Sequence, residues 1–191
     1  MKGLLVILSS PSGGGKTSVI QKLLKAQDHH FRYSVSATTR KPRAGEVDGI
    51  DYFFLTEEQF KVEIDHNEFI EWERVHNYYY GTPRHQIEEW LRDKETVLLD
   101  IDVQGGLRIK LEYPDNCVTI FIAPPSIDEL IKRLQNRKTD SQGEIETRLQ
   151  RVPLEMEKGK HYDHVIVNNN LEETMSKVIE VINLHKLSLE V

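Results

Sequence analysis

The chain has 191 residues, 38% of them hydrophobic and 29% charged, and a formal net charge of −6. Its length suits one domain with a well-buried core and is too short for two typical domains. The acidic balance argues against nucleic acid as the main partner, and no apolar stretch approaches the ~20 residues that span a membrane. The single cysteine, Cys117, excludes an internal disulfide and fits a reducing cytoplasm.

The first apolar run leads directly into a glycine-rich loop. Residues 4–8 predict a buried strand, and a helical pattern extends from residue 17 to residue 26. Strand, glycine-rich turn and helix form the context of a phosphate-binding loop, in which Lys16 supplies charge for the phosphates and Thr17 a hydroxyl for Mg²⁺. The strict pattern has glycine where Ser10 stands, so an ordinary glycine-rich surface turn is the alternative. The expected ATP-binding residues of this loop are Ser12, Gly13, Gly14, Gly15, Lys16 and Thr17.

Residues 34–82 predict a small, mixed, β-rich insertion. The alternation of apolar and polar side chains favours strands at residues 33–38, 52–54 and 69–75. Thr56 and Gln59 have the spacing of a capping box, which starts a short helix that ends near Asp65.

Basic and aromatic side chains of this insertion suit a second, smaller phosphate group. The turn-rich segment 39–46 carries Arg40 and Arg43, while Tyr52 and Tyr80 add neutral donors. A solvated basic turn and ordinary tyrosine packing are the alternatives for these residues. Glu71, on a strand flanked by aromatic residues, is either functional or a solvent-facing strand position.

After the insertion, strands alternate with helices. Pro83 suits the first position of a helix that ends near Arg92, and a second helix is expected over residues 171–187. Buried strands are expected at residues 96–101, 118–122 and 163–167. This alternation predicts an α/β fold with a parallel sheet that has helices on both faces, as in P-loop nucleotide-binding proteins. Asp100 and Asp102 then lie at the carboxyl end of a strand, where such sheets bind ligands.

Two helices are expected between the last two strands, separated by a polar turn at residues 138–143. The first helix starts at a capping box on Ser126, and Arg133 and Arg137 share one of its faces. The second, over residues 144–158, carries Arg148 and Arg151. Pro153 lies inside the second helix and costs about 3 kcal/mol in an ordinary helix, so a kink or a break is expected there.

Taken together, these features resemble the guanylate kinase family, P-loop enzymes that transfer the γ-phosphate of ATP to GMP. The resemblance extends over almost the whole chain, and segments 34–46 and 77–82 separate it from adenylate, thymidylate and shikimate kinases. Lys138 stands where the family commonly places glycine. The matching segments are 10–17, 34–46, 49–54, 69–72, 77–82, 99–105 and 122–126.

The resemblance implies a role for individual residues. It places the GMP phosphate on Arg40, Arg43, Tyr52 and Tyr80. It implies that guanine is recognised by Ser36, Glu71 and Thr82. Asp100 would lie between GMP and a Mg²⁺ ion, and the implied metal ligands are Thr17, Asp100 and Asp102. The implied catalytic residues are Lys16, Arg137, Arg148 and Arg133, and Asn168 would lie near the adenine of ATP.

The expected organisation is a single guanylate kinase-like domain with ATP and GMP as substrates. Its core comprises residues 1–33, 83–125 and 159–191, its GMP-binding insertion residues 34–82 and its lid residues 126–158. Neither nucleic acid nor membrane is an expected partner, and the oligomeric state stays open. Two rival functions are a peptide-binding module of the same fold, which usually loses the loop lysine or glycines, and a kinase for another small phosphate ester.

Overall fold

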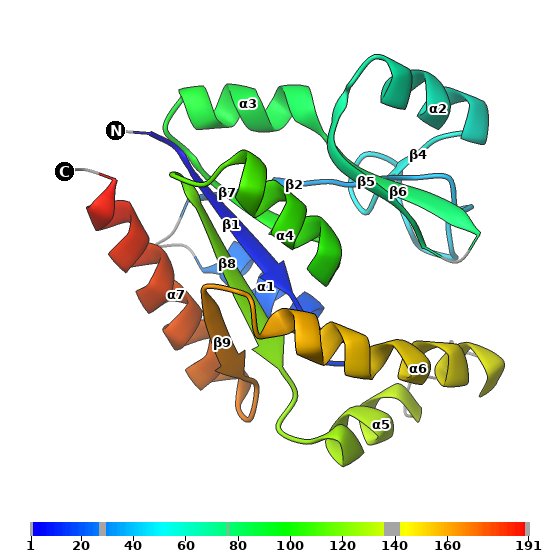
Figure 1. The fold of residues 1–191 in the computed structure, drawn as a ribbon, viewed down its shortest axis with the longest axis vertical. Helices are drawn as coiled ribbons and strands as arrows, with labels where there is room; N and C mark the ends of the chain where they lie inside the picture. Colours follow the sequence, from blue (N-terminus) through cyan, green and yellow to red (C-terminus); the bar gives the residue numbers. More distant parts are fainter. Residues whose placement is uncertain (1, 27–29, 76, 136–141, 190–191) are drawn as a thin grey trace.

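A parallel sheet forms the centre of the protein in the computed structural model, which describes residues 2–26, 30–75, 77–135 and 142–189 (Figure 1). Within these residues the sheet has five strands in the order β2-β7-β1-β8-β9, and every neighbouring pair is parallel. The central strand, β1, is buried along its whole length. The strands are β1 (Leu4–Ser9), β2 (Phe31–Ser34), β7 (Thr96–Asp100), β8 (Cys117–Ala123) and β9 (His164–Val167).

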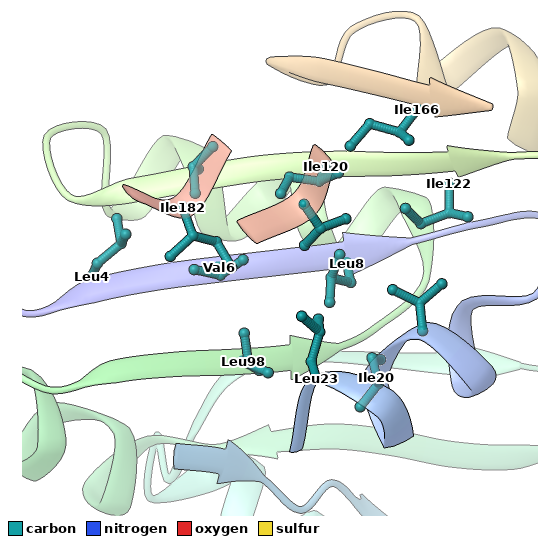
Figure 2. Packing of buried hydrophobic residues seen from close by; sticks show 13 residues of the cluster. Leu4, Val6, Leu8, Ile20, Leu23, Leu98, Ile120, Ile122, Ile166 and Ile182 are labelled. Atoms are coloured by element: carbon teal, nitrogen blue, oxygen red, sulfur yellow. The ribbon is translucent and has the colours of Figure 1, made fainter. Parts of the chain in front are cut away.

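Helices cover both faces of this sheet, which confirms the predicted α/β class. Leu4, Val6 and Leu8 face α1 (Lys16–Lys25) and α7 (Leu171–Ser188), as Figure 2 shows. Leu5 and Ile7 face the opposite side, in the cluster that includes residues of α3 (Arg84–Arg92) and α4 (Val103–Glu112). Successive side chains of a strand point to opposite faces, so a strand buried on both sides is a continuous apolar run. Helix α4 was not predicted, because two glycines weaken its helical pattern.

The predicted β-rich segment forms a second sheet, which in the described residues has the order β4-β3-β6-β5. Its strands β3 and β4 are parallel, whereas β3 and β5 each pair antiparallel with β6. The capping box on Thr56 is confirmed and starts α2 (Glu57–Asp65), whose buried Phe60 stacks on Phe69. The strands are β3 (Ala37–Thr38), β4 (Phe53–Phe54), β5 (Phe69–Val75) and β6 (Tyr78–Pro83).

The strand predicted over residues 33–38 is wrong as a single element. Ser34 pairs with Leu99 in the central sheet, whereas Ala37 pairs with Phe53 and Gly81 in the second sheet. The chain therefore passes from one sheet to the other within two residues. Alternation of side chains is the same in both sheets, so the local pattern could not show this change of partner.

Helices α5 (Ile127–Gln135) and α6 (Gln142–Gly159) form a pair beside the carboxyl ends of β1 and β8 (Figure 1). Leu130, Leu134 and Val152 are buried between them. Of the kink or break predicted at Pro153, the break is wrong, because helix α6 continues through that residue; the kink stays a prediction. Pro153 lies on the exposed side of the helix, where water can satisfy the carbonyl that has no N–H partner. None of the helices in the described ranges is long and apolar enough to cross a bilayer.

Candidate active site

The loop after β1 has the backbone of an anion site. Gly13 and Gly15 have φ values of 86° and 96°, in the left-handed region that favours glycine. A Cβ on Gly14 would lie 2.9 Å from the Cβ of Ser10, so glycine is needed there for space. Gly15 is the N-cap of α1 and provides no side-chain cap. The first N–H groups of α1 are thus left to a ligand, in the geometry that binds phosphate.

Lys16 joins this loop to the end of β7. Its ammonium group forms an ion pair with Asp100 and donates to the carbonyl oxygen of Ile101 at 3.1 Å. The pairing follows from the sheet, because Leu8 at the end of β1 lies opposite Asp100. Asp102 instead caps α4, and its Oδ1 accepts from the backbone N–H groups of Gln104 and Gly105.

Glu71 of β5 is the buried carboxylate of the site, with 8% of its surface exposed. Its Oε1 accepts from the Thr82 hydroxyl at 2.8 Å, and its Oε2 lies 3.4 Å from the guanidinium of Arg108. Burial raises the pKa of Glu71 to about 7, and the charge of Asp102 adds to the rise. Thr82 and Arg108 act in the opposite direction because they interact with the ionised form.

Arg40, Tyr52 and Tyr80 form a cluster on the second sheet. Arg40 makes two hydrogen bonds to the carboxylate of Glu46, at 2.9 and 2.8 Å, and lies 5.3 Å from the centre of the Tyr52 ring. The rings of Tyr52 and Tyr80 are 6.1 Å apart. Burial raises the pKa of Tyr52 to about 12, so its hydroxyl keeps the proton that it would donate to an anion.

A cavity of about 340 Å³ is lined by Lys16, Glu71 and the two tyrosines, Tyr52 and Tyr80. It is lined by the loop, the second sheet, the segment after β7 and helix α6. The structure therefore brings together side chains that are far apart in the sequence. The predicted site residues that line it are Ser12, Lys16, Ser36, Tyr52, Glu71, Tyr80, Asp100, Asp102 and Arg148.

Other predicted residues lie behind or beside this cavity. Thr82 is fully buried and contacts Glu71, and Asn168 donates from Nδ2 to the carbonyl of Gly14 at 3.0 Å. Arg133 forms an ion pair with Glu129, one turn earlier in α5. The remaining predicted residues outside the lining are Gly13, Gly14, Gly15, Thr17, Arg40 and Arg43. Arg137 lies outside the described residues.

Helix α6 contributes two lining residues that were not assigned to the site from the sequence, Arg151 and Glu155. The Ser12 N–H donates to Glu155 Oε2 at 3.4 Å, and Arg148 donates to the Ser12 hydroxyl at 3.3 Å. Burial raises the pKa of Glu155. The sequence did contain a signal for these two residues. Arg151 follows Arg148 by three positions and Glu155 follows Arg151 by four, which puts all three side chains on one face of the helix.

The donor set fits a Mg²⁺ ion that a nucleotide brings with it. Within the described ranges no group of three or more His, Cys, Asp or Glu side chains could hold a metal by itself. Mg²⁺ at nucleotide sites usually keeps several waters and takes one or two protein ligands beside phosphate oxygens. The exposed Thr17 and the carboxylate of Asp100 suit that role. Asp102 suits it less, because one of its oxygens already caps α4.

Comparisons with known proteins agree on one family. A family model described as guanylate kinase matches residues 2–185. The chain is 46% identical to a guanylate kinase of Rickettsia prowazekii (strain Madrid E), over 95% of this chain and 91% of that protein. It is 41% identical to a guanylate kinase of Bacillus subtilis (strain 168), over 99% and 92%. A crystal structure of guanylate kinase from Anaplasma phagocytophilum matches with a TM-score of 0.81 and 33% identity, over 97% of this chain and 87% of that chain.

Proposed function

The chain belongs to the guanylate kinase family, and we propose that it transfers the γ-phosphate of ATP to GMP or dGMP, giving ADP and GDP. The observation that carries this proposal is the shared cavity, in which Lys16 of the phosphate loop and Glu71 of the second sheet line the same space. A phosphoryl donor and a base-bearing acceptor can therefore meet there. Phosphoryl transfer depends mainly on positioning and charge neutralisation, which these side chains supply.

On the ATP side, the loop would hold the phosphates through backbone N–H groups, and Lys16 would follow the charge that develops between the β- and γ-phosphates. Arg148 already contacts the loop at Ser12, which supports a role in neutralising the γ-phosphate. Arg137 and Arg133 keep that proposed role as well. Mg²⁺, held by Thr17 and Asp100 when ATP is bound, would neutralise further phosphate charge.

On the GMP side, the phosphate would contact Arg40, Arg43, Tyr52 and Tyr80. The two tyrosines line the cavity, which supports their role. Arg40 would have to share or exchange its contact with Glu46, since both guanidinium Nη atoms now bond to that carboxylate. Guanine would be recognised by Ser36 and Glu71, with Thr82 holding Glu71 from behind. A cytoplasmic location is part of the same proposal.

A panel of nucleoside monophosphates tests the substrate. With ATP and Mg²⁺, ADP release should be far faster with GMP and dGMP than with AMP, CMP or UMP. Comparable turnover of AMP would overturn the proposed base recognition. Absence of turnover with every nucleotide would favour the rival interpretation, a binding module that keeps only the fold.

A substitution in the loop tests the catalytic assignment. Lys16→Met removes the ammonium group and keeps an unbranched side chain of similar length. We expect kcat to fall by about three or more orders of magnitude, whereas the affinity for GMP changes little because Lys16 is assigned to the ATP phosphates. Near-normal turnover of this variant would contradict the assignment of the loop.

A further inference from the structure

A buried chain of hydrogen bonds ends at the carbonyl that holds Lys16. The Tyr162 hydroxyl donates to the Ser9 hydroxyl at 2.7 Å, and Ser9 donates to the carbonyl of Ile101 at 2.8 Å. Lys16 donates to that same carbonyl at 3.1 Å. Tyr162 is 5% exposed and Ser9 is 0% exposed. Neither lines the cavity, so neither is placed to contact a nucleotide.

The directions of these hydrogen bonds are consistent with one another. The Tyr162 proton has two acceptors in reach, and the Ser9 hydroxyl at 2.7 Å is nearer than the Val103 carbonyl at 3.2 Å. The Ser9 proton likewise lies nearer the Ile101 carbonyl, at 2.8 Å, than the Asp102 carbonyl, at 3.4 Å. A carbonyl oxygen has two lone pairs, and here Ser9 and Lys16 occupy both. Burial raises the pKa of Tyr162, so its hydroxyl stays protonated and remains a donor. A buried chain in which every member is satisfied holds its atoms in place more firmly than separate contacts would.

The packing around Tyr162 is specific for its hydroxyl group. A Cβ on Gly106 of α4 would overlap the Tyr162 oxygen, so glycine makes the room that the hydroxyl needs. The ring lies edge-on to Phe121 at 5.8 Å, which fixes its plane. Ser9 is the last residue of β1, directly before the loop, and Ile101 directly follows β7. These hydrogen bonds therefore connect the end of β1 and the segment after β7, which flank the phosphate site, to the buried Tyr162 hydroxyl.

We propose that Tyr162 and Ser9 are positioning residues for Lys16, acting through the carbonyl of Ile101; the proposal rests on the proposed catalytic role of Lys16. An ammonium group has three protons. The ion pair with Asp100 and the bond to Ile101 orient two of them and leave the third for a phosphate oxygen. Because the Ile101 carbonyl belongs to a connecting segment, its direction depends on the bond from Ser9.

The first test removes only the hydroxyl of Tyr162. Tyr162→Phe keeps the ring against Phe121, and kcat should fall about three- to tenfold, the effect of one hydrogen bond, with KM for GMP within about twofold. Tyr113→Phe is the matched control, because Tyr113 is a half-buried tyrosine that does not belong to this chain of hydrogen bonds. It should leave kcat unchanged. Unchanged kcat in Tyr162→Phe would overturn the proposal, as would an equal loss in both variants.

The second test asks whether Tyr162 acts through Ser9. Ser9→Ala should lower kcat at least as much as Tyr162→Phe, and the double variant should be no slower than Ser9→Ala alone. Additive losses would contradict a serial arrangement. Melting temperatures identify a purely structural role, in which stability falls while the kcat of the folded enzyme stays normal; that result would also overturn the proposal. If Ser9→Ala does not fold, the comparison of Tyr162→Phe with Tyr113→Phe still decides.

Lys16→Met distinguishes a failure of the catalytic role proposed for Lys16 from a failure of the positioning role proposed for Tyr162 and Ser9. If that variant keeps normal kcat, the proposed catalytic role of Lys16 fails, and the positioning proposal fails with it. If Lys16→Met is inactive while Tyr162→Phe and Ser9→Ala have normal kcat, only the positioning proposal fails. The expected result is an inactive Lys16→Met together with partial losses in the other two variants.

Discussion

Glu71 combines a buried carboxylate with the proposed recognition of guanine. Guanine presents N1–H and N2–H₂ donors side by side, and an ionised carboxylate can accept from both. Adenine presents a lone pair at N1 and lacks the 2-amino group, so the same carboxylate would repel it. Burial favours the neutral form, which the pKa of about 7 reflects, while Thr82 and Arg108 favour the ionised form. Thr82 and Arg108 thus favour the ionised Glu71 that guanine requires.

The first prediction concerns affinity. Glu71→Gln keeps the shape of the side chain and replaces an acceptor oxygen with a donor NH₂, so one guanine donor loses its partner. We expect KM for GMP to rise about ten- to hundredfold, equivalent to roughly 1–3 kcal/mol. Glu73→Gln is the matched control, because Glu73 lies on the same strand and contacts Arg108 but does not line the cavity. Equal KM changes in both variants would contradict the proposal.

The second prediction concerns stability. The pKa of Glu71 rises from 4.5 to about 7 on folding, so the folded state binds the proton more tightly. The stability that this residue contributes is therefore fully present below about pH 4.5 and is lost as pH rises to about 7. Glu71→Gln lacks this titration. The melting temperature of the native protein relative to that of the variant should fall between pH 5 and pH 8, and a constant difference would contradict the assigned pKa.

At the level of single elements, helix α6 connects the α5–α6 pair to the phosphate loop. Arg148 and Glu155 both contact Ser12 from this helix, although Pro153 lies between them. A proline in a helix interior removes a hydrogen bond and clashes with the preceding turn. The helix is held instead by the packing of its Val152 with Leu130 and Leu134 of α5. Tertiary contacts thus outweigh local helix propensity in this element.

The third prediction follows from this balance. Pro153→Ala restores the backbone donor on the exposed side of α6 and should stabilise the helix locally by about 1–3 kcal/mol. Amide hydrogen exchange within α6, followed by mass spectrometry, should slow in the variant. Gln150→Ala, an exposed change in the same helix, should have a much smaller effect. Faster exchange after Pro153→Ala would mean that proline favours the native geometry of the helix.

At the scale of the whole molecule, the cavity joins three parts of the chain. We propose that these are the core, the insertion of residues 34–82 and the lid of residues 126–158, which move relative to one another. The cavity of about 340 Å³ lies at the low end of the range for small-molecule sites, roughly 300–1,000 Å³. Two nucleotides extend beyond a cavity of this size, so the parts must close over the portions that lie outside it. Closure would also exclude water, which could otherwise accept the phosphoryl group.

The fourth prediction is that closure requires both nucleotides. Neither phosphate site alone bridges the cavity, so only the ternary complex gains contacts on all sides. Small-angle X-ray scattering should show a smaller radius of gyration with GMP and a non-hydrolysable ATP analogue together. Samples with either nucleotide alone serve as controls and should resemble the free protein. The same radius in all four samples would contradict the proposed motion.

Features that depend on local patterns were predictable from the sequence. The apolar run at residues 4–8, the glycines between it and Lys16, and the capping box on Thr56 are set by neighbours within a few residues, where periods of 2 and 3.6 and turn chemistry are decisive. These patterns, with the segments that resemble guanylate kinases, were sufficient for the fold class and the family. They also located nine of the residues that line the cavity.

Contacts between side chains that are distant in the sequence could not be predicted in this way. Lys16 and Ile101 are 85 residues apart, and Ser9 and Tyr162 are 153 apart. Their contacts depend on the order in which β1, β7, β8 and β9 lie in the sheet, and no local period carries that order. The split of residues 33–38 between two sheets has the same cause. Tyr162, Ser9 and Arg108 were missed for this reason: each is ordinary in its own segment and becomes significant only through its partner across the fold.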